Sequence, residues 1–178
     1  GIDAFLVRDL NRDGMINDGS ELFGSATVLS NGTKAKEGYA ALSDLDDNHD
    51  TMLTTSDQAF AELSLWIDTN LNAQTDEGEM LTLREAHISS LHLSNNQINR
   101  IDQGNIVGAS SLYTLDDERI FETVDVQFAS QSISHSLDFD QIIQSIHAFK
   151  EPKALDMCQY EQTCINLPSN IIVNAYQQ

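Results

Sequence analysis

The chain has 178 residues, of which 40% are apolar, enough for one well-buried domain. Asp and Glu number 28 against 9 Lys and Arg, so the formal net charge is −19. This charge disfavours nucleic acid and anionic lipid as partners, and no apolar run is long enough for membrane insertion. We expect a monomeric domain over residues 1–150 and a C-terminal extension over 151–178, either docked on that domain or partly free.

The first half of the chain mixes short elements with acidic loops. The apolar run 4–7 meets an acidic loop too soon for a helix, which predicts a strand. Apolar residues at helical spacing predict two short helices, one over 36–45 and one starting at Asp57 and continuing to 67. The segment TLREAHI, 82–88, predicts another brief helix, and the alternation in SSLHLS, 89–94, predicts a strand.

The second half has a different pattern, with polar segments between alternating apolar runs. We predict a loop over 94–105, strands over 111–115 and 120–128 joined by a hairpin through Asp116 and Asp117, and an amphipathic helix over 138–149. The apolar run 171–173 has no convincing period and is interpreted as a final docked strand or part of a mobile tail. The expected fold class is α+β: EF-hand-like calcium loops with short helices, then a small antiparallel sheet and a C-terminal helix.

Three acidic segments carry the ligand spacing of an EF-hand calcium loop. Such a loop takes oxygen ligands from positions 1, 3, 5, 7, 9 and 12, with a main-chain carbonyl at position 7 and a carboxylate at position 12. The segment DTNLNAQTDEGE satisfies all six positions. Its candidate ligands are Asp68, Asn70, Asn72, Gln74 through its carbonyl, Asp76 and Glu79.

The other two segments depart slightly from this rule. DDNHDTMLTTSD ends in the shorter Asp, and DLNRDGMINDGSE places its final Glu one residue late. The candidate ligands of the former are Asp46, Asn48, Asp50, the Met52 carbonyl, Thr54 and Asp57. Those of the latter are Asp9, Asn11, Asp13, the Met15 carbonyl, Asn17 and Glu21.

Position 6 of an EF-hand loop normally holds glycine, because the backbone there is left-handed. Only Gly14 meets this requirement; Thr51 and Ala73 stand at the other two positions and should weaken those sites. Any one segment can also be read as an ordinary turn rich in Asp and Asn. Three at matching spacing favour about three bound Ca²⁺ ions, since hard oxygen ligands prefer Ca²⁺ to Zn²⁺ or Cu²⁺ and a flexible loop prefers it to Mg²⁺.

The strings DLNRDGMINDGSELFG, GYAALSDLDDNHD, LWIDTNLNAQTDEGEMLTL and ISSLHL, in this order, resemble a calcium-binding module of very large RTX proteins of Gram-negative bacteria. The resemblance covers about residues 3–130. It implies one of two activities: calcium-dependent capture of peptide or protein C-termini on a host surface, as in RTX adhesins, or calcium-dependent self-cleavage at an Asp-Pro bond. No Asp-Pro bond is present, because the two prolines follow Glu151 and Leu167.

We therefore expect a calcium-dependent adhesion module, with a calcium-stabilised spacer and a self-processing module as alternatives. No catalytic residues are predicted: the carboxylates sit at metal-ligand spacing, and no histidine adjoins a recognisable nucleophile motif. We interpret a start at Gly1 without methionine as a segment of a longer bacterial protein, secreted or at the cell surface. Cys158 and Cys164 could form a disulfide or remain free thiols.

Overall fold

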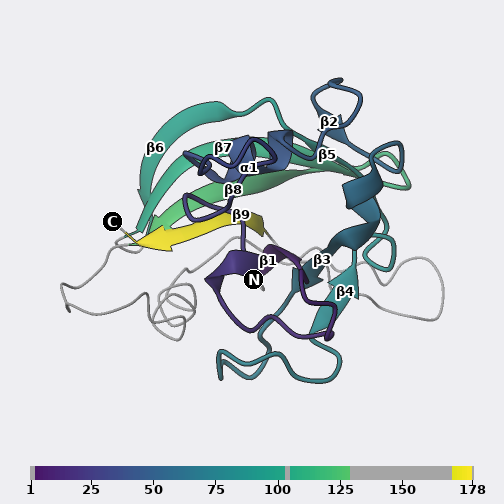
Figure 1. The fold of residues 1–178 in the computed structure, drawn as a ribbon, viewed down its shortest axis with the longest axis vertical. Helices are drawn as coiled ribbons and strands as arrows, with labels where there is room; N and C mark the ends of the chain where they lie inside the picture. Colours follow the sequence, from purple (N-terminus) through teal and green to yellow (C-terminus); the bar gives the residue numbers. More distant parts are fainter. Residues whose placement is uncertain (1–2, 103–104, 129–169, 178) are drawn as a thin grey trace.

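The computed structural model describes residues 3–102, 105–128 and 170–177. These residues form one strongly curled, mixed β-sheet that closes about halfway into a barrel (Figure 1). The strand order is β2-β5-β7-β8-β9-β1-β3-β4, and β6 pairs with β7 outside this path. The strands are β1 (Asp3–Arg8), β2 (Met52–Leu53), β3 (Leu63–Trp66), β4 (Met80–Thr82), β5 (Ile88–His92), β6 (Asn96–Asp102), β7 (Asn105–Leu115), β8 (Ile120–Phe128) and β9 (Asn170–Gln177).

The expected α+β class is wrong, because the described residues are mostly β. They contain one α-helix, α1 (Gly38–Ser43), and two 3₁₀ turns, η1 (Gly19–Glu21) and η2 (Gln58–Glu62). Helix α1 lies within the predicted helix 36–45. The helix predicted from Asp57 is η2 followed by strand β3, because β3 pairs antiparallel with β1 and this tertiary pairing outweighs the local periodicity.

Two further predictions fail for related reasons. Residues 83–87 form a compact turn between β4 and β5 in place of the brief helix predicted over 82–88, and the predicted loop 94–105 contains strand β6. Strand β6 pairs only with β7, so it is an edge strand exposed to water, and its polar sequence resembles that of a loop. The strands predicted at 4–7, 89–94, 111–115 and 120–128 and the hairpin at Asp116 are confirmed.

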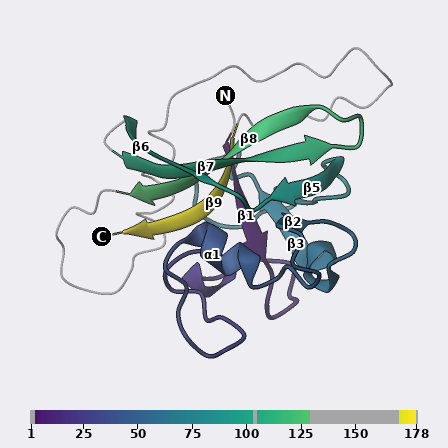
Figure 2. The same cartoon turned by 90° about the horizontal axis from the view of Figure 1, so that it is seen from above.

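Strand β9 brings the end of the chain into the middle of the sheet (Figure 2). It pairs parallel to β8 on one side and parallel to β1 on the other. Ile171, Ile172 and Val173 are buried, as expected for a strand covered on both faces. The predicted helix 138–149 and the two cysteines lie outside the described residues.

Alternate residues of β1 enter two different hydrophobic clusters, which shows that both faces of the sheet are covered. Ala4 and Leu6 join the larger cluster, together with residues of α1. Phe5 and Val7 join the smaller one, where the Phe5 ring lies 5.8 Å from the ring of Trp66. Two of the acidic loops pack against this second cluster. No helix in the described ranges is long and apolar enough to cross a bilayer.

Candidate calcium-binding loops

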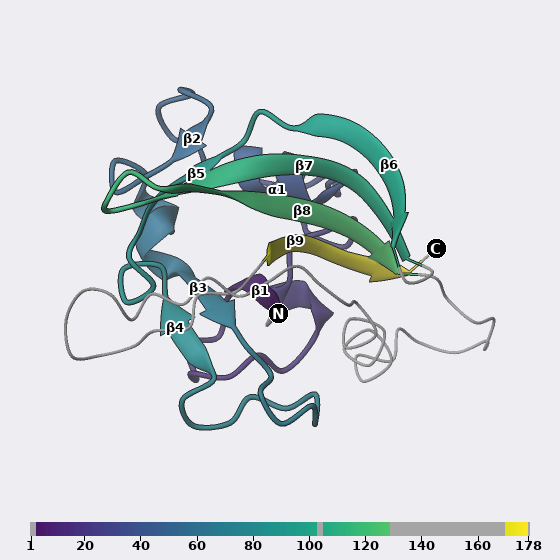
Figure 3. The same cartoon turned by 180° about the vertical axis from the view of Figure 1, so that it is seen from behind.

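Three acidic loops connect the short elements in the first half of the chain (Figure 3). Loop 1 (residues 9–21) follows β1 and ends in η1, loop 2 (46–57) follows α1 and leads into η2, and loop 3 (68–79) joins β3 to β4. Only loop 2 is entered from an α-helix. Loops 1 and 3 thus depart from the helix-loop-helix form, as the strand predicted before loop 1 suggested.

The carboxylate at position 1 of each loop accepts hydrogen bonds from two main-chain N–H groups further along its own loop. One of the two always belongs to position 6, so the chain is wrapped around this side chain in the same way three times. The acceptors and donors are Asp9 with Arg12 (2.6 Å) and Gly14 (2.7 Å), Asp46 with Asp50 (3.3 Å) and Thr51 (2.9 Å), and Asp68 with Asn72 (3.1 Å) and Ala73 (2.9 Å).

The carboxylate at the end of each loop bridges two more N–H groups, those of positions 2 and 9. The extra residue in loop 1 does not alter this pattern, because Glu21 reaches the same two positions. The pairs are Glu21 with Leu10 (3.1 Å) and Asn17 (2.8 Å), Asp57 with Asp47 (3.0 Å) and Thr54 (2.9 Å), and Glu79 with Thr69 (2.8 Å) and Asp76 (3.1 Å).

Positions 4 and 6 of every loop have a positive φ, which turns the chain back on itself. At position 6 this places Gly14 at 81°, Thr51 at 68° and Ala73 at 58°, confirming that two residues with side chains occupy the left-handed region. That conformation costs roughly 1–2 kcal/mol per residue. Position 4 is occupied by Arg12, His49 and Leu71, also at positive φ. The loops therefore share one backbone path despite different sequences.

The side chains at positions 3 and 5 complete the turns by accepting the N–H two residues ahead. These bonds run from Asp13 to Asn11, Met15 to Asp13, Asp50 to Asn48, Met52 to Asp50, Asn72 to Asn70 and Gln74 to Asn72, at 2.8–3.1 Å. In loop 3 the amides of Asn70 and Asn72 also donate to Asp76, at 2.7 Å each. These bonds hold the pKa of the Asp76 carboxyl below its usual value.

Burial singles out the carboxylates at the ends of the loops. Within the described ranges six acidic residues are buried: Glu21, Asp46, Asp57, Asp68, Glu79 and Asp125. Five of the six occupy the first or last ligand position of a loop. The ion pairs of the described residues reach none of Glu21, Asp57 and Glu79. Buried carboxylates are costly unless they are hydrogen-bonded, paired or bound to a metal, and in these loops the partners that the structure shows are main-chain N–H groups.

In the ranges described, no three His, Cys, Asp or Glu side chains form a metal-binding group. A metal bound in these loops would therefore need further oxygens from amide side chains and from the main-chain carbonyls of Met15, Met52 and Gln74, as in an EF-hand loop.

Two threonines that the ligand spacing does not point to support the loops. The Thr69 hydroxyl donates to the Glu79 carboxylate at 2.8 Å, and the Thr75 hydroxyl accepts the N–H of Ile16 at 2.9 Å. They occupy positions 2 and 8 of loop 3, which lie outside the ligand pattern. The other two loops carry the apolar residues Ile16 and Leu53 at position 8. These apolar residues indicate that position 8 is buried, which was the signal that could have pointed to Thr75.

Comparison with known proteins finds a family match over most of the chain. Residues 1–129 match the SPM domain family. The iron-regulated protein FrpA of Neisseria meningitidis serogroup C is 38% identical over 141 residues, which cover 79% of this chain and 13% of FrpA. The chain therefore spans a small part of this relative. Because the family match covers most of its length, the chain belongs to the SPM domain family.

Proposed function

We propose that each of the three loops binds one Ca²⁺ ion and that the domain depends on these ions for its native stability. The observation that carries this proposal is the threefold repetition of one arrangement. In each loop a carboxylate at each end is fixed by main-chain N–H groups, and positions 4 and 6 are left-handed. An ordinary acidic turn has no reason to repeat all of these features.

The residues of the loops fit the ion. Loop 1 would hold it through Asp9, Asn11, Asp13, the Met15 carbonyl, Asn17 and Glu21, loop 2 through Asp46, Asn48, Asp50, the Met52 carbonyl, Thr54 and Asp57, and loop 3 through Asp68, Asn70, Asn72, the Gln74 carbonyl, Asp76 and Glu79. All are hard oxygen donors, the type Ca²⁺ prefers. Bound Ca²⁺ would compensate the buried carboxylates and offset part of the net charge of −19.

We further propose that the domain is a calcium-dependent adhesion module of a large secreted or surface-bound RTX protein, which captures peptide or protein C-termini on a host surface. The resemblance to RTX adhesin modules supports this, as does the small share of FrpA that the chain spans. A strongly acidic domain repels a carboxylate unless a cation is available, so ligand capture that depends on calcium is physically reasonable.

A second candidate is calcium-dependent self-processing. The same residues resemble RTX self-processing modules, and residues 1–129 match the SPM domain family. Self-processing would need an Asp-Pro bond, which is absent from this sequence. Expression together with the natural upstream sequence separates the two candidates: a self-processing protein yields a shorter band on a gel after Ca²⁺ is added, whereas an adhesion module keeps its length.

Thermal unfolding with Ca²⁺ and with a chelator tests the calcium proposal. A ligand present at about 100 times its Kd stabilises a protein by about 2.7 kcal/mol, which raises the Tm of a domain of this size by roughly 5–10 °C. Glu79→Gln should remove much of the contribution that loop 3 makes to the rise in Tm caused by Ca²⁺. Glu77→Gln is the matched control, because Glu77 is exposed in the same loop and is not a candidate ligand.

The result that would refute calcium binding is a Tm that is equal in Ca²⁺ and in chelator for the unmodified protein. Equal losses in Glu79→Gln and Glu77→Gln would argue against the ligand assignment in loop 3. A spacer, the third possibility, would show the calcium effect but bind no peptide.

A further inference from the structure

A cavity of about 620 Å³ lies at the Leu63 end of β3, the end opposite to loop 3. It is bordered by η2, the turn between β4 and β5, and the turn between β7 and β8. This volume falls in the range of about 300–1,000 Å³ that is typical of sites for small ligands. It is large enough for one or two amino-acid side chains.

The walls of this cavity are apolar. Phe60, Leu63, Leu83 and Ile88 line it, and all four belong to the main hydrophobic cluster. Hydroxyl groups are present as well, but that of Ser89 already donates to the main-chain carbonyls of β7. The interior therefore favours an apolar group over a polar one.

The rim carries one cation, Arg84, and one anion, Asp116. Asp116 contacts His87 at 3.2 Å. Arg84 is exposed, and its guanidinium forms no ion pair with any residue that the structure describes. A guanidinium presents several N–H donors in a planar fork that matches a carboxylate. In a chain with so few basic residues, an unpaired arginine beside an apolar cavity is a notable feature.

The turn that presents Arg84 is firmly held. The Arg84 carbonyl accepts the N–H of His87 at 3.0 Å, and Ile88 donates to Leu83 at 2.8 Å. At the start of the turn, Thr82 and Glu85 bond each other through both main chain and side chain. The backbone position of Arg84 is thus fixed before any ligand arrives, which reduces the entropy lost on binding.

The opposite wall depends on loop 2. Thr55, which lines the cavity, lies within loop 2, and the Phe60 N–H donates to the carbonyl of Asp57, the last candidate ligand of that loop. Asp57 in turn fixes loop 2 through its carboxylate. If loop 2 loosens, the segment that carries Phe60 loosens with it.

We propose that this cavity binds the C-terminal residue of a peptide, with the apolar side chain inside and the terminal carboxylate on Arg84. The ligand chemistry follows from a free guanidinium at the mouth of an apolar cavity. The proposal rests on the calcium function proposed above, because Ca²⁺ in loop 2 holds the wall formed by η2. Calcium then acts on binding through the shape of the cavity, and the carboxylate is held by arginine.

Fluorescence anisotropy in Ca²⁺ tests this site. The probes are fluorescein-labelled heptapeptides of glycine and serine that end in leucine, isoleucine or phenylalanine, each with a free carboxylate or a C-terminal amide. The free acids should bind and the amides should bind at least about tenfold more weakly, since a charge-assisted pair is lost. Arg84→Gln should weaken binding of the free acids by a similar factor and leave the amides unchanged.

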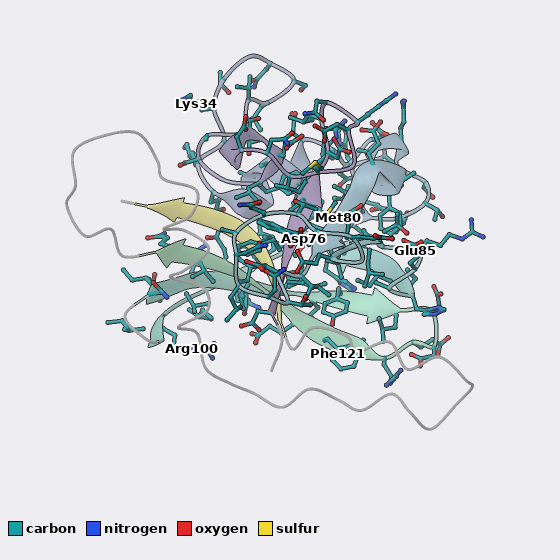
Figure 4. All side chains as sticks on the ribbon, turned by 90° about the horizontal axis from the view of Figure 1, so that it is seen from below. Lys34, Asp76, Met80, Glu85, Arg100 and Phe121 are labelled. Atoms are coloured by element: carbon teal, nitrogen blue, oxygen red, sulfur yellow. The ribbon has the colours of Figure 1, made fainter. Side chains whose placement is uncertain are left out.

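Lys34→Gln is the matched control for the lost charge. Lys34 is exposed and lies on the opposite side of the molecule from Glu85, which marks the turn of Arg84 (Figure 4). Ala61→Trp provides a second, independent variant, because Ala61 is an exposed residue of the cavity lining and a large side chain there would fill the space. The free-acid peptides should bind to Lys34→Gln as to the unmodified protein and should not bind to Ala61→Trp.

Two further variants test whether peptide binding depends on the calcium loop next to the cavity, loop 2. Asp57→Asn should weaken peptide binding, whereas Glu79→Gln, in the distant loop 3, should leave it intact at saturating Ca²⁺. Equal binding of acids and amides, unchanged binding by Arg84→Gln, or no binding of any peptide would each overturn the assignment of the cavity. The Tm in Ca²⁺ and in chelator, recorded for the same samples, shows separately whether the calcium function fails.

Discussion

The main-chain N–H of Ile16 donates a 2.9 Å hydrogen bond to the hydroxyl oxygen of Thr75, joining position 8 of loop 1 to position 8 of loop 3. Both residues are buried, and Ile16 shares a hydrophobic cluster with Ala73 of loop 3. The corresponding residue of loop 2, Leu53, pairs instead with Leu91 of β5. Loops 1 and 3 therefore form a contacting pair, and loop 2 lies apart from them.

Replacement of Thr75 by valine should destabilise the protein by about 1–3 kcal/mol, because it leaves the buried N–H of Ile16 without its partner. Urea unfolding in saturating Ca²⁺ measures the change. Thr75→Ser keeps the hydroxyl and should restore most of the stability, and Thr55→Val is the control at an exposed threonine. If Thr75→Val and Thr55→Val cost the same, the bond between the loops contributes nothing.

Substitutions at the left-handed position 6 should change the stability in opposite directions in loops 1 and 2. Gly14→Ala places a side chain at a φ of 81° and should cost roughly 1–2 kcal/mol, although its Cβ would meet no atom within 4 Å. Thr51→Gly relieves the same strain at 68° and should stabilise the protein by up to about 1 kcal/mol, after subtracting the greater flexibility of glycine in the unfolded chain.

Unfolding midpoints in urea, with Ca²⁺ in excess, distinguish these effects. The N–H of Thr51 still reaches Asp46 in the glycine variant, so the loop keeps its hydrogen bonds. A loss of stability in Thr51→Gly would show that the threonine side chain contributes more than its backbone conformation costs.

The sequence predicts those parts of the structure that depend on interactions between residues close together in the chain. The turns of the acidic loops depend on residues a few positions apart, such as Asp46 and Thr51, so their spacing was readable. The conversion of 63–66 into strand β3 depends on β1, more than fifty residues earlier, and no local pattern reports that pairing. The curled sheet escaped prediction for the same reason, since β9 joins β8 to β1 from the far end of the chain.

The position of β9 predicts that the end of the chain is essential for folding. Ile171→Ala should cost about 2–5 kcal/mol, because the side chain is fully buried in the main cluster. Ile101→Ala, on the exposed edge strand β6, is the control and should change stability by no more than about 0.5 kcal/mol. Chemical denaturation of both variants tests this, and equal effects would mean that β9 adds little to the sheet.

Two buried tyrosines should respond differently to loss of the hydroxyl. The Tyr39 hydroxyl lies 2.8 Å from that of Thr123, whereas the Tyr113 hydroxyl has no hydrogen-bond partner among the residues the structure describes. Tyr39→Phe should therefore destabilise the protein by about 1 kcal/mol, and Tyr113→Phe should be neutral or stabilising. Denaturation at pH 7 compares the two, and a larger loss for Tyr113→Phe would contradict this account.

The same two tyrosines should make the stability of the protein depend on pH in the alkaline range. Burial raises the pKa of Tyr113 to about 12 and that of Tyr39 further still, from an ordinary value of 10.0. Above pH 10 the unfolded chain releases these protons while the folded chain retains them, so stability is fully present below pH 10 and falls as the pH rises toward 12. Each Phe variant should flatten this fall, measured by urea unfolding between pH 9 and 11.5. An unchanged slope in both variants would show that other groups control alkaline unfolding.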